Sequence, residues 1–231
     1  MTLRLLSLLA GLAVLGFARA QTPSPSPAAD PATFVPDIAR ASAGEGNDAF
    51  AKGDYKTARH AYLRVLELVP NNLVALVNLG LVEFRAGNPK EAEKYLKQAV
   101  QLRLETGPAW LTLGMMELDQ GRIDEAFAAL SQAVLYDGSN ARAHNYLGVV
   151  LGRKGWIDGA EQELRRAVEL DPAARDAHYN LAVIYLQETP PAIELARRHY
   201  FRAVELGGAP DAAIEKTLGT PVEKSSPTPS P

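Results

Sequence analysis

The stretch AWLTLGMMELDQGRIDEAFAALSQAVLYDGSN, residues 109–140, decides the fold. Apolar residues recur in it at spacings of three and four, first over 110–118 and again over 126–134, which predicts two amphipathic helices. Gly121 separates the two runs and suits the left-handed residue that ends a helix. The stretch is therefore predicted to form a helix-turn-helix unit.

The same unit recurs along the chain with a period of about 34 residues, which is typical of repeat architectures. Small residues keep one register over at least four units, because two helices approach closely only where side chains lack bulk. Within one unit we expect Gly114 and Ala126 to meet at the helix crossing. The four columns are Gly46, Gly80, Gly114, Gly148 (continued by Ala182); Ala58, Ala92, Ala126, Ala160; Val65, Ala99, Ala133, Ala167; and Gly53, Gly87, Gly121, Gly155.

This pattern resembles the tetratricopeptide repeat, a helix-turn-helix unit of about 34 residues. The resemblance covers residues 39–208 and is strongest over 109–140 and 143–172. It implies an all-α, right-handed superhelical solenoid of about five units. Extra residues around 189–191 shift the later columns of the fifth unit. The predicted units are 39–72, 73–106, 107–140, 141–174 and 175–208, and the shifted columns of the fifth contain Ala196 and Ala203.

The ends of a repeat array need elements that cover their apolar faces. At the C-terminal end, Asp211 is predicted to N-cap a helix within 209–219. Ile214 and Leu218 of that helix would face the last unit. At the N-terminal end, three apolar residues are expected to cover the first unit: Phe34, Val35 and Ile38.

Residues 1–20 read as a signal peptide. Arg4 is followed by a short apolar run, and Ala18-Arg19-Ala20 is a small-x-small cleavage site. The alternative is an uncleaved anchor, in which case alone we expect membrane association. The pattern predicts export, to the bacterial periplasm or cell envelope or as a secreted protein.

Two segments rich in Pro and Ser flank the repeats, a linker over 21–38 and a tail over 220–231. Such sequences cannot bury enough apolar surface to offset the entropy of ordering, so extended, disordered spacers are expected. A Pro-rich docking motif is the alternative, but neither segment has the flanking basic or aromatic pattern that would support it.

The composition excludes several classes of chemistry. The chain has 231 residues, no Cys and a formal net charge of -3, which rules out thiol catalysis and disulfides and argues against nucleic-acid binding. The G-x-G-x-x-A match at 44–49 lacks the preceding strand that dinucleotide binding needs. No zinc-protease, phosphate-loop or nucleophile-elbow motif occurs. We therefore predict no enzyme, no cofactor and no small-molecule substrate.

The four histidines do not predict a metal site. His144 and His178 lie one repeat apart, in a column that the resemblance assigns to packing between helices. They are predicted to be hydrogen-bonded and partly buried rather than metal ligands, since no carboxylate cluster completes a site. His60 and His199 are expected to be isolated on second helices.

The resemblance implies that first helices line an inner groove, where a partner would bind. The stripe is largely apolar, and its asparagines are available to a peptide backbone; plain core packing is the alternative. The predicted groove residues are Val77, Asn78, Leu81, Phe84, Leu111, Met115, Leu118, Asn145, Val149, Tyr179, Asn180, Val183 and Leu186.

A chaperone-type carboxylate clamp is not expected, because uncharged residues stand where that subclass has cations, at Ala43, Pro108 and Thr112. The predicted function is a non-catalytic scaffold or adaptor of the cell envelope that binds a protein or peptide segment. The alternative is a self-assembling structural module, or a groove occupied by the chain's own tail. In the groove hypothesis, Glu at Leu111 and Met115 should abolish partner capture without unfolding the protein.

Overall fold

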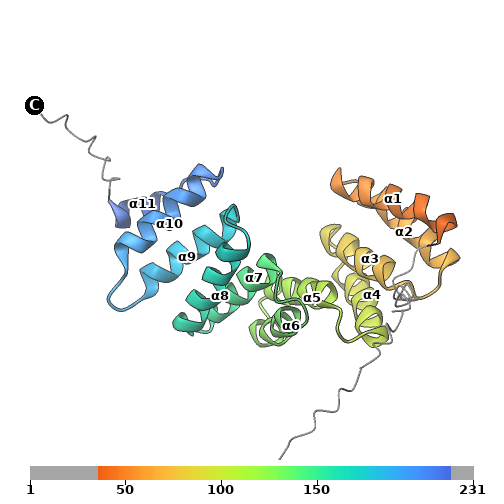
Figure 1. The fold of residues 1–231 in the computed structure, drawn as a ribbon, viewed down its shortest axis with the longest axis horizontal. Coiled ribbons are helices and arrows are strands. Elements are labelled where there is room, and N and C mark those ends of the chain that lie inside the picture. The colour runs from red at the N-terminus through yellow and green to blue at the C-terminus, as the bar shows by residue number, and fades with distance from the viewer. Residues whose placement is uncertain (1–35, 220–231) are drawn as a thin grey trace, which may run out of the picture. The chain divides into compact units, whose positions relative to one another are not determined.

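The computed structural model describes residues 36–219, which form eleven α-helices and no strand (Figure 1). The predicted signal segment, most of the linker and the tail lie outside these residues. The all-α prediction is confirmed. The helices are α1 (Asp37–Ala51), α2 (Tyr55–Leu68), α3 (Leu73–Arg85), α4 (Pro89–Leu102), α5 (Gly107–Asp119), α6 (Ile123–Tyr136), α7 (Ala141–Arg153), α8 (Ile157–Leu170), α9 (Arg175–Gln187), α10 (Ile193–Glu205) and α11 (Ala212–Leu218).

The helices pair within units through short turns that have glycine at the centre. Gly53, Gly87, Gly121 and Gly155 have φ between 73° and 79°, the left-handed conformation that glycine adopts without a Cβ penalty. The predicted role of this column is confirmed. Several helices begin at a side-chain cap; Asn140 Oδ1, for example, accepts a hydrogen bond from the Ala143 amide at 3.2 Å.

Close approach within a unit explains the first glycine column. A Cβ added to Gly148 would lie 2.5 Å from Leu164 Cγ, and one added to Gly114 would lie 2.4 Å from Leu130 Cγ. The neighbour of Gly114 is therefore Leu130, one turn beyond the Ala126 that the sequence suggested. Ala126 is fully buried nonetheless.

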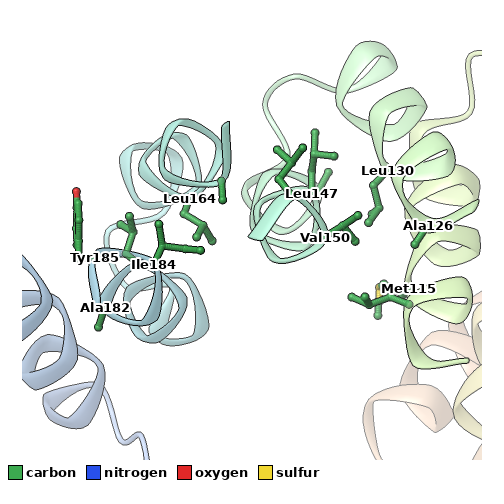
Figure 2. Close-up of a cluster of buried hydrophobic side chains, with 14 of the residues drawn as sticks. Met115, Ala126, Leu130, Leu147, Val150, Leu164, Ala182, Ile184 and Tyr185 are labelled. Carbon is green, nitrogen blue, oxygen red and sulfur yellow. The ribbon is translucent and has the colours of Figure 1, made fainter. Parts of the chain in front are cut away.

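Units stack because each second helix packs on the first helix of the next unit, and first helices of neighbouring units also touch (α3 with α5, α5 with α7, α7 with α9). The result is the predicted solenoid. A continuous core runs from α5 to α11; Figure 2 shows Leu130, Leu147, Val150, Leu164 and Ile184 from successive helices within it.

The C-terminal cap agrees with the prediction. Asp211 Oδ1 accepts hydrogen bonds from the Ala213 and Ile214 amides at 3.0 and 3.2 Å, and Leu218 is buried against the core. The N-terminal expectation is wrong for Ile38, whose residue surface is 71% exposed. Phe34 and Val35 lie outside the described residues. Helix α1 begins at Asp37, inside the predicted linker.

The fifth unit carries its insertion between α9 and α10, next to a cis Thr189–Pro190 peptide bond. Ala196 and Ala203 are buried at the shifted positions, as expected. None of the helices found over residues 36–219 has the length and apolar content needed to cross a membrane.

Candidate functional site

A cavity of about 860 Å³ lies open on the face formed by α7 and α9 and is bounded by α10 and the segment that leads into α11. We call this surface the C-terminal groove. It brings together four predicted groove residues, Asn145, Val149, Tyr179 and Asn180. Its other lining residues are Tyr146, Arg175, Asp176, Ala203, Val204, Gly208, Ala209, Pro210, Asp211 and Ala212.

Two asparagines from neighbouring units meet in this groove. Asn180 Nδ2 donates to Asn145 Oδ1 at 2.9 Å. Each carboxamide has two donor hydrogens and a two-lone-pair acceptor, so this bond leaves the Asn145 amino group and the Asn180 carbonyl oxygen for another molecule. Both side chains are only half-buried. The pair can therefore offer a donor and an acceptor to one peptide unit.

The groove wall is tied to the capping helix by a tyrosine. The Tyr179 hydroxyl donates to Asp211 Oδ2 at 2.9 Å. Hydrogen bonds from the Ile214 amide and from Tyr179 hold the pKa of Asp211 below its usual value, and the bond to Asp211 raises the pKa of Tyr179. The cap thus fixes both the end of the solenoid and the position of a groove side chain.

Two further cavities continue the groove. One of about 410 Å³ shares Asn145, Tyr146, Arg175 and Asp176 with it; because three arginines line this cavity, we call it the arginine pocket. The other, of about 190 Å³, shares Val149 and Asn180 and adds Val183. The remaining residues of the arginine pocket are Arg85, Ala141, Arg142, Asp171, Ala174 and Ala177.

In the third unit the predicted groove residues are buried rather than exposed. Leu111, Met115 and Leu118 are only 7%, 5% and 8% exposed and belong to the core, where Figure 2 labels Met115. Arg142 Nη2 lies 3.8 Å from Met115 Sδ. At this unit the core alternative applies, and the expectation that Glu at Leu111 and Met115 leaves the fold intact is wrong, since both charges would be buried.

The remaining predicted residues lie apart from these cavities. They are half-buried, and three of them pack on the core clusters: Val77, Phe84 and Leu186. Asn78 and Leu81 share α3 with Val77. The structure therefore concentrates the candidate site in the fourth and fifth units.

Sequence reasoning missed the arginines of the groove. Arg85 and Arg142 occupy the thirteenth and second positions of their units, which the family architecture places on the inner face, but the prediction weighed only the apolar and asparagine columns. It also missed Tyr146 and the loop before α11, whose involvement depends on how the cap folds back.

The histidines confirm the packing interpretation with one correction. His144 Nδ1 lies 2.6 Å from Glu163 Oε2 and its Nε2 lies 3.2 Å from the Gly138 carbonyl. His199 is not isolated: its Nδ1 lies 2.9 Å from His178 Nδ1. Within residues 36–219, no cluster of three or more His, Asp or Glu side chains could hold a metal ion.

Two protein-family models match the chain. A model described as tetratricopeptide repeat matches residues 44–105 and 151–213, and one described as TPR repeat matches 114–155. No match was found among curated proteins.

Solved structures share the fold. MamA is 26% identical, with 70% of this chain and 94% of MamA covered and a TM-score of 0.58. Pseudomonas aeruginosa pilF is 20% identical over 79% of this chain and 85% of its own, with a TM-score of 0.69. A thermophilic TPR protein of Thermus thermophilus is 21% identical over 78% of this chain and 96% of its own, with a TM-score of 0.61.

Proposed function

Because the chain belongs to the tetratricopeptide repeat family, we propose that it is a non-catalytic adaptor that binds an extended protein segment in the C-terminal groove. The Asn145–Asn180 pair carries the proposal, since it presents a free donor and a free acceptor inside a cavity of peptide dimensions. An extended backbone needs such partners when it leaves water.

The apolar part of the groove supports the same function. Val149, Tyr179 and Val183 are half-buried beside the asparagines, so a bound segment can bury side chains there while its backbone is hydrogen-bonded. Affinity would come from removing this apolar surface from water, and orientation from the carboxamides.

Site-specific crosslinking tests the groove. A photoreactive phenylalanine analogue at Tyr146, which lines both large cavities, should capture one partner in cells. The same analogue at Leu135, a 70% exposed residue of α6, is the control. Asn145→Ala with Asn180→Ala should remove the capture from Tyr146. Equal capture from both positions, or capture unchanged by the two alanines, would disprove the groove function.

A location in the cell envelope is part of the proposal and is supported by the signal-peptide pattern of residues 1–20. Fractionation of cells that make the full chain, compared with a chain in which Leu5, Leu6 and Leu8 are replaced by Arg, tests it. Export of the first and cytosolic retention of the second are expected; the same fraction for both would refute an envelope role.

A further inference from the structure

Three arginines from different helices line the arginine pocket. Arg85 comes from the last turn of α3, Arg142 from the first turn of α7, and Arg175 from the first turn of α9. Two carboxylates, Asp171 and Asp176, also line it. The charge of the pocket depends on how these five groups pair.

The carboxylates do not neutralise Arg85 and Arg142. Asp176 pairs with Arg175 at 2.9 Å, and Asp171 accepts a hydrogen bond from the Ala173 amide at 3.0 Å. Over residues 36–219, no carboxylate lies within ion-pair distance of Arg85 or Arg142. The side-chain contact of Arg142 is with the sulfur of Met115, a weak acceptor.

Three arginines and two aspartates give the arginine pocket a net formal charge of +1, whereas the chain as a whole has a net charge of -3. Arg153, which lines the small cavity of the groove, also has no carboxylate partner within the described residues. Other arginines do have carboxylate partners, namely Arg40, Arg59, Arg64, Arg122, Arg165, Arg166, Arg175, Arg197 and Arg202.

We infer that the groove takes an acidic partner: an extended peptide whose backbone meets Asn145 and Asn180 and whose Asp or Glu side chain enters the arginine pocket between Arg85 and Arg142. This inference rests on the proposed function. A carboxylate accepts bidentate, charge-assisted hydrogen bonds from guanidinium groups. The two cavities share Asn145 and Tyr146, so one segment reaches both.

A displayed library of random peptides of about twelve residues, which span roughly 40 Å when extended, is the probe. Selection on the purified protein should enrich Asp and Glu above the unselected library. Binding of the enriched peptides should weaken about tenfold to a hundredfold with Arg142→Gln and with Arg85→Gln, the loss of one charge-assisted contact. Arg198→Gln is the matched control, since Arg198 also lacks a carboxylate partner among the described residues but lines a different cavity. Thermal unfolding of each variant checks its fold.

The outcomes separate the two proposals. Enriched peptides that lose binding with Asn145→Ala and Asn180→Ala but show no acidic excess, or bind Arg142→Gln and Arg85→Gln normally, overturn the acidic partner and leave the groove function standing. Peptides unaffected by the asparagine variants overturn both. Equal weakening by Arg198→Gln places the peptide on the other cavity and also overturns the inference.

Discussion

The fourth and fifth units place a histidine at the same position and give it opposite partners. His144 and His178 lie one repeat apart, and Nε2 of each lies 3.2 Å from a backbone carbonyl, of Gly138 and Pro172 respectively. Nδ1 of His144 faces Glu163, whereas Nδ1 of His178 faces His199. Glu163 and His199 are equivalent once the two extra residues of the fifth unit are counted.

The partners determine the charge of each ring. Both neighbours of His144 are acceptors, so both of its nitrogens must donate; the bond to Glu163 raises the His144 pKa, and the ring favours the imidazolium form. Nε2 of His178 faces a carbonyl, to which it can only donate; in the neutral ring Nδ1 is then the acceptor, and it receives the hydrogen bond from His199. Burial, the repulsion between two protonated rings at His178 and His199, and the charges of Arg198 and Arg165 lower the His199 pKa to about 4, and burial also lowers that of His178.

The fourth and fifth units also differ in the residues that meet where their two helices cross. Gly148 packs on Leu164, and the corresponding residues of the fifth unit are Ala182 and Tyr200, both fully buried. The repeat thus keeps a small residue at the helix crossing, while the residue that packs on it differs from unit to unit. Fold stability and local chemistry are therefore carried by different positions of one unit.

The largest contrast is expected when a charge is placed in the column of small residues that contains Ala167. Ala167 and its counterpart Ala203 are both buried, at 0% and 2% exposed, but Ala203 also lines the C-terminal groove. Ala167→Glu should cost about 3 to 5 kcal/mol of unfolding free energy, because the charge is buried without a partner. Ala203→Glu should cost about 1 to 2 kcal/mol, since its carboxylate reaches the cavity. Urea unfolding measures both; equal losses would contradict the open groove.

The next largest effect on stability is expected at the close contact between Gly148 and Leu164 in the fourth unit. Gly148→Ala should cost about 1 to 3 kcal/mol, because the new methyl group would overlap Leu164. In a Leu164→Ala background the same change should cost less, since only the Ala160 carbonyl oxygen, 3.2 Å from the new Cβ, still crowds it; the expected coupling is about 1 to 2 kcal/mol in a double-mutant cycle. Additive effects in urea unfolding would mean that Leu164 is not what the glycine accommodates.

The pH dependence of stability should differ in sign between the units. The folded pKa of His199 lies below the unfolded value of 6.5, so the unfolded chain binds more protons as the pH falls from 6.5 toward 4, and stability is lost over that window. His199→Gln retains a donor for His178 and should recover about 1 to 2 kcal/mol near pH 4.5 relative to the parent chain. His144 contributes stability below pH 6.5 that is lost as the pH rises through its raised pKa.

His144→Gln is the opposing variant. The unfolding free energy that His144→Gln loses relative to the parent chain should become smaller as the pH rises. The unfolding free energy that His199→Gln gains should become larger as the pH falls. Urea unfolding across pH 4 to 8 measures both difference curves. Curves with the same sign would show that burial, rather than the partner, governs the two rings.

Much of this organisation could be predicted from the sequence, and the parts that could not be predicted have physical reasons. The glycine and alanine columns were predictable because every unit needs a close crossing and a left-handed turn, which only small residues satisfy. The His178–His199 pair was not, because the insertion near Thr189 moves His199 two positions out of register. Arg85 and Arg142 belong to the second and fourth units and share a pocket only after α3, α5 and α7 have stacked, which no local pattern encodes.

Exchanging the partners gives the smallest and most direct test of the comparison. Glu163→Gln removes the acceptor charge and should lower the His144 pKa by about one unit, whereas His199→Glu should raise the His178 pKa by a similar amount. Ring-proton chemical shifts followed against pH by NMR report each histidine separately. His60, exposed on α2 of a different unit, serves as the internal control. If His178 acquires a raised pKa with Glu at position 199, a single side chain converts the chemistry of the fifth unit into that of the fourth. If it does not, the cations Arg198 and Arg202, which lower the His178 pKa, outweigh the partner, and the difference between the units belongs to the whole surface of α10 rather than to one pair.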